Sequence, residues 1–265
     1  MSSQAGVPHL LEHPVSSYAQ KVKIALREKN VEFTSEIPSD ISSSADGPLH
    51  HSNPRVEVPV LIHNGNKIFD STIILEYIED MWSERPLLPK DPGQRAKARM
   101  IEDVCDTQYE AVNWGLGEIR AFARAEGALK DQLEGTAQQQ TATLQDWLEQ
   151  QLEGPWFNGS SFGWADASVA PIVNRSVVYG YGPSEGSKLK AWHQRLMERE
   201  SVKKTFEEFE KGLGGMRNPA IKEMYLSGQM QREYRDHRLE WMIKSGGMEI
   251  IHKGLEKGNI RFSWP

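Results

Sequence analysis

Residues 58–78, VPVLIHNGNKIFDSTIILEYI, contain the pattern that decides the fold. Two short strand-like runs, 58–62 and 67–69, flank the dipeptide Asn64-Gly65. Both residues of such a dipeptide tolerate the positive φ angles of a two-residue turn, so the stretch predicts a β-hairpin. Apolar residues then follow with helical rather than alternating spacing, which predicts a helix directly after the hairpin.

That helix has a recognisable start. Asp70 or Ser71 can cap it, because either side chain can accept a hydrogen bond from the first unpaired backbone N–H groups. Its apolar face consists of Ile74, Leu75 and Ile78.

The residues before the hairpin predict a strand, a helix and a second strand. Val7–Glu12 is an apolar strand candidate, and a helical run follows in which Ser17 and Gln20 have the spacing of a capping box. Val31–Ile37 alternates apolar and polar residues, as a half-buried strand does. Residues 38–54 are polar and contain three prolines, which predicts a loop. The order β-α-β, loop, β-β-α indicates a small α/β layer fold.

Helical patterns dominate after residue 85. Prolines at 86, 89 and 92 predict a linker. Helices are expected near 93–126, 136–153, 165–179, 186–199 and 201–212. One more is expected in the tail, with one face formed by Met230, Tyr234, His237 and Trp241 and its end at Gly246-Gly247. The predicted organisation is an α/β domain at 1–84, an all-helical domain at 92–212 and a helical extension at 213–265.

Charge and composition exclude several classes of protein. The formal net charge of −6 argues against a nucleic-acid binder that depends on overall positive charge. The basic residues gather in the tail, since 213–265 holds nine Lys/Arg and six Asp/Glu. Cys105 is the only cysteine, which excludes an intrachain disulfide and a Cys-rich zinc site. Without a secretory leader or an apolar run of about 20 residues, the chain is predicted to be cytoplasmic, with no membrane partner and no metal.

Three motifs in order resemble the cytosolic glutathione S-transferase family, over about residues 7–212. The first is Pro14 and Ser16-Ser17 at a helix start, followed by Lys21-Val22. The second is Val58-Pro59 before the hairpin, with Asp70-Ser71 after it. The third is Phe162, Ala165 and Asp166 in a helix after Gly159, similar to the folding motif of the family's second domain.

The resemblance implies an α/β thioredoxin-like N-terminal domain of order β-α-β-α-β-β-α, followed by an all-α domain. The Ser16-Ser17 pair is similar to the serine-type, zeta-like class, and long tails are familiar in fungal members. The implied cofactor is glutathione, whose thiol resembles a free Cys thiol and is little ionised at neutral pH.

The resemblance implies catalytic roles for the two serines. Ser16 aligns with the family's catalytic serine and is expected to stabilise the glutathione thiolate, while Ser17 is expected to cap the helix and to act as a second donor. Tyr18 is an alternative hydroxyl, expected to face along the helix. A helix N-terminus favours an anion, because its N–H groups are unpaired and its dipole is positive there.

The resemblance also implies a glutathione-binding set. The backbone of Val58, before a cis Pro59, would pair with the cysteinyl part of glutathione. Ser71 would hold the γ-glutamyl carboxylate at a helix N-terminus, and Asp70 the ammonium group.

Two positions depart from the family pattern. Glu57 stands where a basic or amide side chain often helps to bind the glycyl carboxylate, and His50, His51 or Arg55 could substitute for it. Gly163 stands at the N-cap of the second-domain motif, where Ser or Thr is usual. Glycine costs only a few tenths of a kcal/mol relative to Ser at such a position.

The resemblance places the acceptor site between the domains, where Cys105, Tyr109, Trp114 and Phe122 are candidates, although aromatic residues in a long helix are more often core. Aromatic residues of the tail could cover this pocket or extend a homodimer: Tyr225, Tyr234, Trp241, Phe262 and Trp264.

The implied function is addition of the glutathione thiolate to a small electrophile, giving a conjugate or a cis–trans isomerisation. The alternative is a non-catalytic regulatory or interaction protein with the same fold. Glu57 and the long tail favour that alternative, whereas Ser16, Val58-Pro59 and Ser71 oppose it.

Overall fold

The computed structural model describes residues 6–41, 46–216, 219–227, 229 and 237–260. The predictions made for Met230, Tyr234, Phe262 and Trp264 fall outside these residues.

The N-terminal part is built on a mixed four-stranded sheet of order β2-β1-β3-β4. Its strands are β1 (His9–Leu11), β2 (Thr34–Glu36), β3 (Val60–His63) and β4 (Asn66–Phe69). Strand β1 pairs in parallel with β2 and antiparallel with β3, and β3 pairs antiparallel with β4.

The hairpin at the centre of the sequence pattern is confirmed. Asn64 and Gly65 both have positive φ angles, 50° and 79°, as a tight turn between β3 and β4 requires. The prediction for Val31–Ile37 was wrong in extent, because β2 is three residues long and all three are exposed. The partly buried side chains of Val31 and Phe33 precede the strand and pack against the core.

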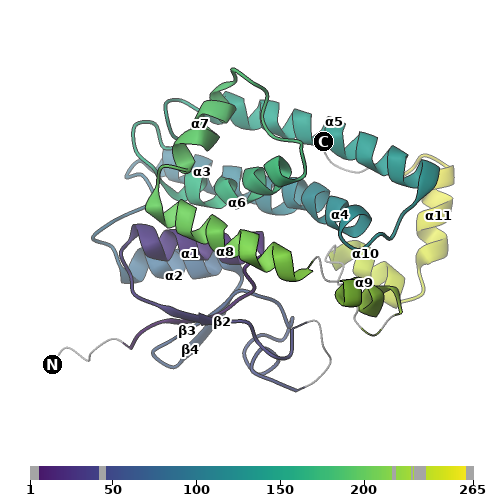
Figure 1. The fold of residues 1–265 in the computed structure, drawn as a ribbon, viewed down its shortest axis with the longest axis horizontal. Coiled ribbons are helices and arrows are strands. Elements are labelled where there is room, and N and C mark those ends of the chain that lie inside the picture. The colour runs from purple at the N-terminus through teal and green to yellow at the C-terminus, as the bar shows by residue number, and fades with distance from the viewer. Residues whose placement is uncertain (1–5, 42–45, 217–218, 228, 230–236, 261–265) are drawn as a thin grey trace.

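Helices α1 (Ser17–Glu28) and α2 (Ser71–Met81) lie side by side between the sheet and the helical part of the chain (Figure 1). The loop 37–59 packs apolar side chains on the opposite side, with Leu49 against Leu11 and Val60. Its described residues form turns, as the loop prediction had it, where the family order has a helix.

The second part is helical, which confirms the predicted fold class. It contains α3 (Pro92–Val104), a π-helical turn η1 (Cys105–Tyr109), α4 (Glu110–Arg120), α5 (Gly127–Gln151), α6 (Trp164–Val178), α7 (Lys188–Leu196) and α8 (Glu200–Met216). The first long helix ends six residues earlier than predicted. Helix α5 starts nine residues earlier than predicted. Leu129 and Leu133 in its first turns are exposed, so these turns have no apolar buried face from which the sequence could predict them.

Helix α6 forms the centre of this part. Its residues from Trp164 to Ser176 are all buried, and it packs against α1 and α3. Asp166 fixes its start by accepting hydrogen bonds from the N–H of Gly163 at 2.9 Å and from the Trp192 indole at 2.7 Å. Gly163 is the N-cap, as the sequence indicated.

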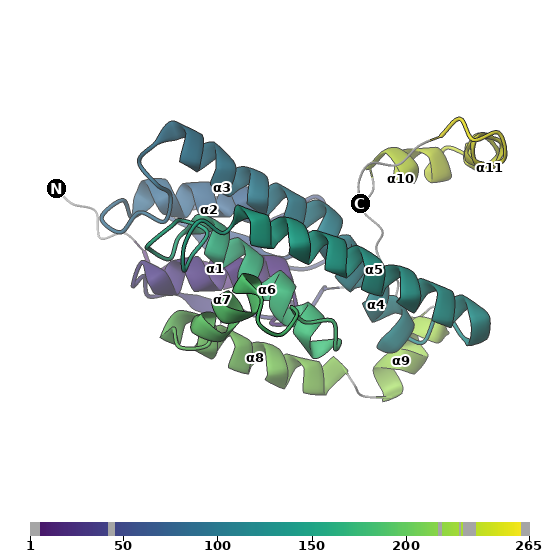
Figure 2. The same ribbon diagram turned by 90° about the horizontal axis from the view of Figure 1, so that it is seen from above.

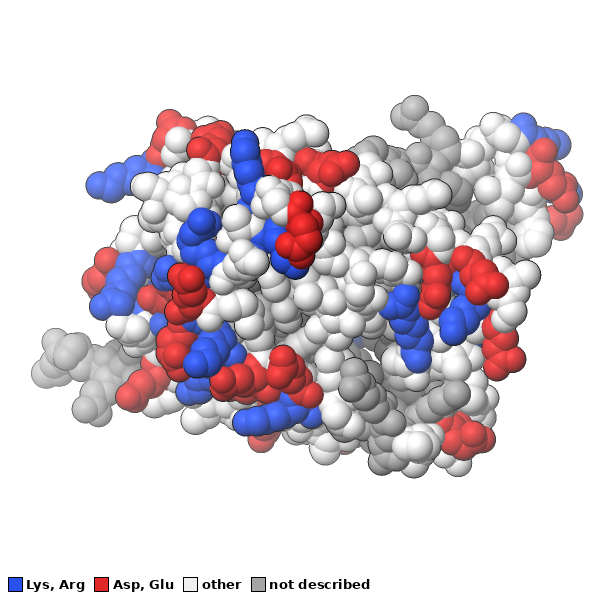
Figure 3. Space-filling view, turned by 45° about the horizontal axis from the view of Figure 1, so that its top comes forward, with Lys and Arg blue, Asp and Glu red and all other residues white. Residues whose placement is uncertain are grey.

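The described residues of the tail form three short helices. They are α9 (Pro219–Leu226), α10 (His237–Lys244) and α11 (Met248–Glu256). Figure 2 shows α10 and α11 standing off from the rest of the molecule, and Trp241 on α10 is 66% exposed. On the face in Figure 3, acidic and basic side chains lie beside one another rather than in separate areas.

Among the described residues, no helix is both long and apolar enough to cross a membrane. Within the same ranges, no group of three or more His, Cys, Asp and Glu side chains could hold a metal ion.

Candidate glutathione site

A cavity of about 310 Å³ lies where the loop before β3 and the start of α2 face α3 and η1. Five of the predicted binding residues line it: Glu57, Val58, Pro59, Asp70 and Ser71. They come from two separate segments, which the β3–β4 hairpin brings together. The helical part contributes the opposite wall, including Arg99, Asp103 and Asp106.

The Val58–Pro59 peptide bond is cis, as the resemblance implied. The loop before it is held by Asn53, whose side-chain amide donates to the carbonyl of Glu57 at 2.9 Å. Val58 and Pro59 therefore present an irregular stretch of backbone to the cavity, just before β3 begins.

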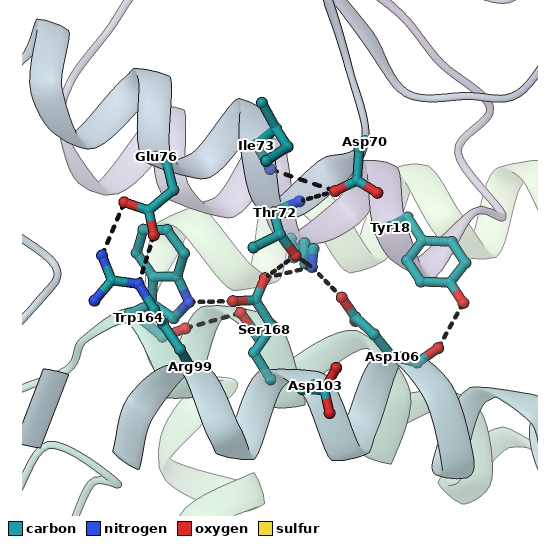
Figure 4. A network of polar contacts seen from close by, with 12 residues as sticks. Tyr18, Asp70, Thr72, Ile73, Glu76, Arg99, Asp103, Asp106, Trp164 and Ser168 are labelled. Carbon is teal, nitrogen blue, oxygen red and sulfur yellow. Dashed lines mark hydrogen bonds and ion pairs between the residues drawn. The ribbon is translucent and has the colours of Figure 1, made fainter. Parts of the chain in front are cut away.

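Asp70 is the N-cap of α2. Its Oδ1 accepts the N–H of Thr72 at 3.0 Å and that of Ile73 at 3.4 Å (Figure 4). Its φ angle of 71° is uncommon for a residue other than glycine and turns the chain sharply into the helix. Ser71 is the first helical residue, buried at the helix start where unpaired N–H groups favour an anion.

The roles expected for Ser16 and Ser17 in capping α1 are reversed in the structure. Ser16 is the N-cap, with extended backbone, and its Oγ accepts the N–H of Ala19 at 3.3 Å. Ser17 is the first helical residue, is 2% exposed, and its hydroxyl has no hydrogen-bond partner among the described residues. The predicted capping box is absent, because the Gln20 amide donates instead to the carbonyl of Pro14 at 2.9 Å.

Neither serine lines the cavity, but Tyr18 does. The Tyr18 hydroxyl donates to the backbone carbonyl of Asp106 at 2.8 Å, so its side chain crosses from α1 to η1 (Figure 4). The expectation that this side chain faces along the helix was wrong.

A buried polar network lies beneath the cavity. The Lys21 ammonium is 2.5 Å from Oε1 of Glu102 and also contacts Oδ2 of Asp106. The Trp164 indole donates to the other oxygen of Glu102. Burial alone would lower the pKa of Lys21, but the two carboxylates outweigh it and raise that pKa, so the ammonium stays charged.

Asp106 differs from an ordinary aspartate. Burial raises the pKa of its carboxyl to about 7; Lys21 opposes this rise, and the neighbouring charge of Glu102 adds to it. Asp106 was not among the residues predicted from the sequence. Glu102 and Asp106 are four residues apart in a predicted helix and so share a face, which was the available signal.

The basic residues that could bind the glycyl carboxylate in place of Glu57 differ in whether they line the cavity. His51 is exposed, pairs with Asp46 at 2.9 Å and does not line the cavity. His50 pairs with Asp40 at 3.1 Å. Arg55 does line the cavity, with its guanidinium 3.7 Å from Oδ2 of Asp70, and His237 of α10 lines it as well.

The four residues suggested for the acceptor site do not line this cavity. Cys105, Tyr109 and Phe122 are buried in the helical part. Burial raises the pKa of the Cys105 thiol well above its usual value, so this thiol stays neutral, like a small apolar residue.

Comparisons with known proteins agree with the geometry. The model of the glutathione S-transferase N-terminal domain matches residues 10–86, and that of the C-terminal domain matches 126–195. Glutathione S-transferase U25 of Arabidopsis thaliana is 32% identical over 209 residues, covering 76% of this chain and 90% of that protein.

Two solved structures are also similar. A tau-class glutathione S-transferase from mango, Mangifera indica, is 27% identical with a TM-score of 0.66, over 81% of this chain and 97% of that one. Rice GST1 in complex with glutathione is 25% identical with a TM-score of 0.65, over 84% and 99% of the two chains. The mango protein is of the tau class, so these similarities give the predicted zeta-like class no specific support.

Proposed function

Because the chain belongs to the glutathione S-transferase family, we propose that it binds glutathione in the described cavity and adds its thiolate to a small electrophile, in particular an α,β-unsaturated one. The observation that carries the proposal is the convergence of Val58, the cis Pro59, Asp70 and Ser71 on one cavity.

Three groups of glutathione suit residues that line this cavity. Its γ-glutamyl carboxylate suits the N-terminus of α2 at Ser71, where backbone N–H groups and the helix dipole favour negative charge. The γ-glutamyl ammonium suits Asp70, whose Oδ2 is not used in capping the helix. The backbone at Val58 can pair with the cysteinyl amide, as an edge strand pairs with an added strand.

Ser16 remains the proposed thiolate stabiliser. As N-cap, its oxygen accepts a hydrogen bond from Ala19, so its own O–H is available to donate to a sulfur anion. The N-terminus of α1 adds a favourable dipole at the same point. Ser17 is proposed as a secondary contributor only, because its hydroxyl is buried.

The electrophile would enter from the side of the helical part. Addition of the thiolate moves charge from sulfur to the acceptor oxygen, so the site needs to stabilise an enolate as well as a thiolate. Isomerisation would begin with the same addition and would then need bond rotation and loss of the thiolate. The zeta-like serine pair is its only support, so conjugation is the reaction proposed. The homodimer, the three-part division of the chain and a cytoplasmic location remain part of the proposal.

The proposal is tested with the full chain. Glutathione binding is measured by titration calorimetry, and turnover is measured with 1-chloro-2,4-dinitrobenzene and with an α,β-unsaturated ketone. We expect binding and a conjugate, and a larger fall in kcat for Ser16→Ala than for Ser17→Ala. Equal losses for the two variants would show that the roles of Ser16 and Ser17 are assigned wrongly. Absence of both binding and glutathione consumption would favour the non-catalytic alternative.

A further inference from the structure

We propose that Asp106 is a catalytic residue for the electrophile half of the reaction, whose carboxylic acid gives a proton to the carbon next to the carbonyl after the thiolate has added. This inference rests on the proposed function. It concerns a residue on the wall opposite the expected glutathione-binding residues, in the same cavity as Val58 and Ser71.

The position of Asp106 is set by two features. It lies in the π-helical turn Cys105–Tyr109, a widened turn of a kind found frequently at functional sites. Its backbone carbonyl accepts the hydroxyl of Tyr18 from the other part of the chain. Helix α1 therefore holds Asp106 at two points, its backbone carbonyl through Tyr18 and its carboxylate through Lys21 (Figure 4).

The carboxyl group has one oxygen in use and one without a partner. Its Oδ2 contacts the Lys21 ammonium, whereas its Oδ1 is shielded from solvent and has no hydrogen-bond partner among the described residues. A buried carboxylate oxygen without a donor is costly, and a proton on that oxygen lowers the cost because the group becomes neutral. The arrangement favours a neutral acid that can donate.

The neighbouring charges explain why Asp106 holds the proton. A single ammonium, Lys21, serves both Asp106 and Glu102, and Glu110 adds a third carboxyl nearby. Glu102 accepts further hydrogen bonds from Trp164 and Thr72, whereas Oδ1 of Asp106 accepts none from the described residues.

The remaining ionisable groups around Asp106 come from four elements. They are Tyr18 on α1, Arg99 and Asp103 on α3, Cys105 on η1 and His237 on α10. Cys105 stays neutral. With a pKa raised to about 7, mainly by burial, Asp106 can both take and give a proton near neutral pH.

The reaction balances without an outside reagent. Glutathione ionises and its thiol proton passes to water, while Asp106 starts as the neutral acid. The thiolate then forms a C–S bond with the β-carbon, and the π electrons move onto the carbonyl oxygen as an enolate. The enolate carbon takes the proton from the Asp106 carboxylic acid, which gives the neutral conjugate. The carboxylate then takes up a proton from water, equal to the one that the thiol released.

The test compares two electrophiles that differ in their need for a proton. Addition to an α,β-unsaturated ketone needs a proton on carbon, whereas 1-chloro-2,4-dinitrobenzene loses chloride and needs none. Asp106→Asn keeps the size of the side chain but cannot donate in this way. Glu12→Gln is the matched control, because Glu12 is also a buried carboxylate paired with a lysine, Lys23 at 2.8 Å, but lies outside the cavity.

For Asp106→Asn we expect kcat with the ketone to fall about 100-fold, at the low end of general-acid contributions, and kcat with the aryl chloride to change less than about threefold. Glu12→Gln should leave kcat with both electrophiles unchanged. An equal loss with both electrophiles would show a structural role and overturn the proposal, as would no loss with either. Inactivity of the wild-type enzyme toward both electrophiles would instead contradict the proposed function.

A measurement on the wild-type protein does not depend on how the variant folds. In D₂O, delivery by one fixed acid should place deuterium on a single face of the new α-carbon, which NMR of the conjugate reveals. Equal labelling of both faces would mean that solvent supplies the proton and would overturn the proposal.

Discussion

The ammonium of Lys21 on α1 lies 2.5 Å from Oε1 of Glu102 on α3, with the two side chains only 1% and 2% exposed. This pair joins the α/β part to the helical part directly beneath the candidate site. A buried ion pair gives little net stability when intact, but removing one partner leaves an uncompensated charge. The intact pair therefore holds α1 of the α/β part and α3 of the helical part in one relative position.

Lys21→Met should lower the free energy of unfolding by about 3–5 kcal/mol, because Glu102 and Asp106 would lose their shared cation. Urea denaturation followed by circular dichroism measures the change. The control is Lys97→Met, whose pair with Glu153 at 2.6 Å is partly exposed and should matter by less than about 1 kcal/mol. Equal midpoints for Lys21→Met and the wild type would contradict this account.

Gly163→Ser should destabilise the protein, although serine is the usual N-cap residue. A Cβ at this position would lie 2.7 Å from the carbonyl oxygen of Leu87 and 2.6 Å from the amide nitrogen of Asn158. The overcrowding should cost about 1–3 kcal/mol and exceed any gain from capping. Gly135→Ala on α5 is the control, since open space surrounds it and alanine should stabilise the helix by up to about 1 kcal/mol. A more stable Gly163→Ser variant would refute the steric explanation.

The sequence predicted what depends on neighbours along the chain. Asn64 and Gly65 specify their turn by their own tolerance of positive φ, and the hairpin then brings Val58 near Ser71. Local residue preferences could not predict which of Ser16 and Ser17 caps helix α1. Both side chains have the same chemistry, and the decision depends on the extended backbone at Ser16.

The opposite wall of the site depends on contacts between distant residues. Lys21 and Glu102 are 81 positions apart, and Tyr18 meets Asp106 across 88. Periodicity places Glu102 and Asp106 on one helix face but does not say which helix that face meets. The environment that changes the pKa of Asp106 is therefore a property of the folded chain alone.

His193 should make stability fall on acidification. Burial, with a smaller effect of Lys190, lowers its pKa to about 4 from an ordinary value near 6.5. Between these two values the unfolded chain binds more protons, so stability decreases as pH falls from about 6.5 to 4, by up to about 3 kcal/mol. Asp166, whose pKa burial raises to about 6, acts in the opposite direction, so the useful quantity is a difference between variants.

His193→Gln should accordingly lose less stability than the wild type between pH 7 and pH 4.5. Urea titrations of both proteins at several pH values supply the measurement. Parallel stability curves would mean that His193 is able to bind a proton in the folded state without penalty.

Ser71→Ala should raise the KM for glutathione more than it lowers kcat. The residue stands at the start of α2, beside the proposed position of the γ-glutamyl carboxylate and away from the reacting sulfur. Losing a hydrogen bond to a charged group should raise KM by about tenfold, since such bonds contribute about 1.5–3 kcal/mol. Steady-state kinetics with varied glutathione separates the two parameters, and a fall confined to kcat would contradict the assignment.

Glu57→Lys should tighten glutathione binding. Glu57 lines the cavity beside Val58, on the side where a glycyl carboxylate would lie if the cysteinyl part pairs with Val58. Two carboxylates there repel each other, whereas a lysine would attract the glycyl end, so we expect the calorimetric Kd to fall several-fold. The effect should shrink between 20 mM and 500 mM salt, because the Debye length shortens to a few Å. Asp46→Lys makes the same charge change on an exposed residue outside the cavity and should leave Kd unaltered. Weaker binding by Glu57→Lys would indicate that the Glu57 side chain itself helps to hold glutathione.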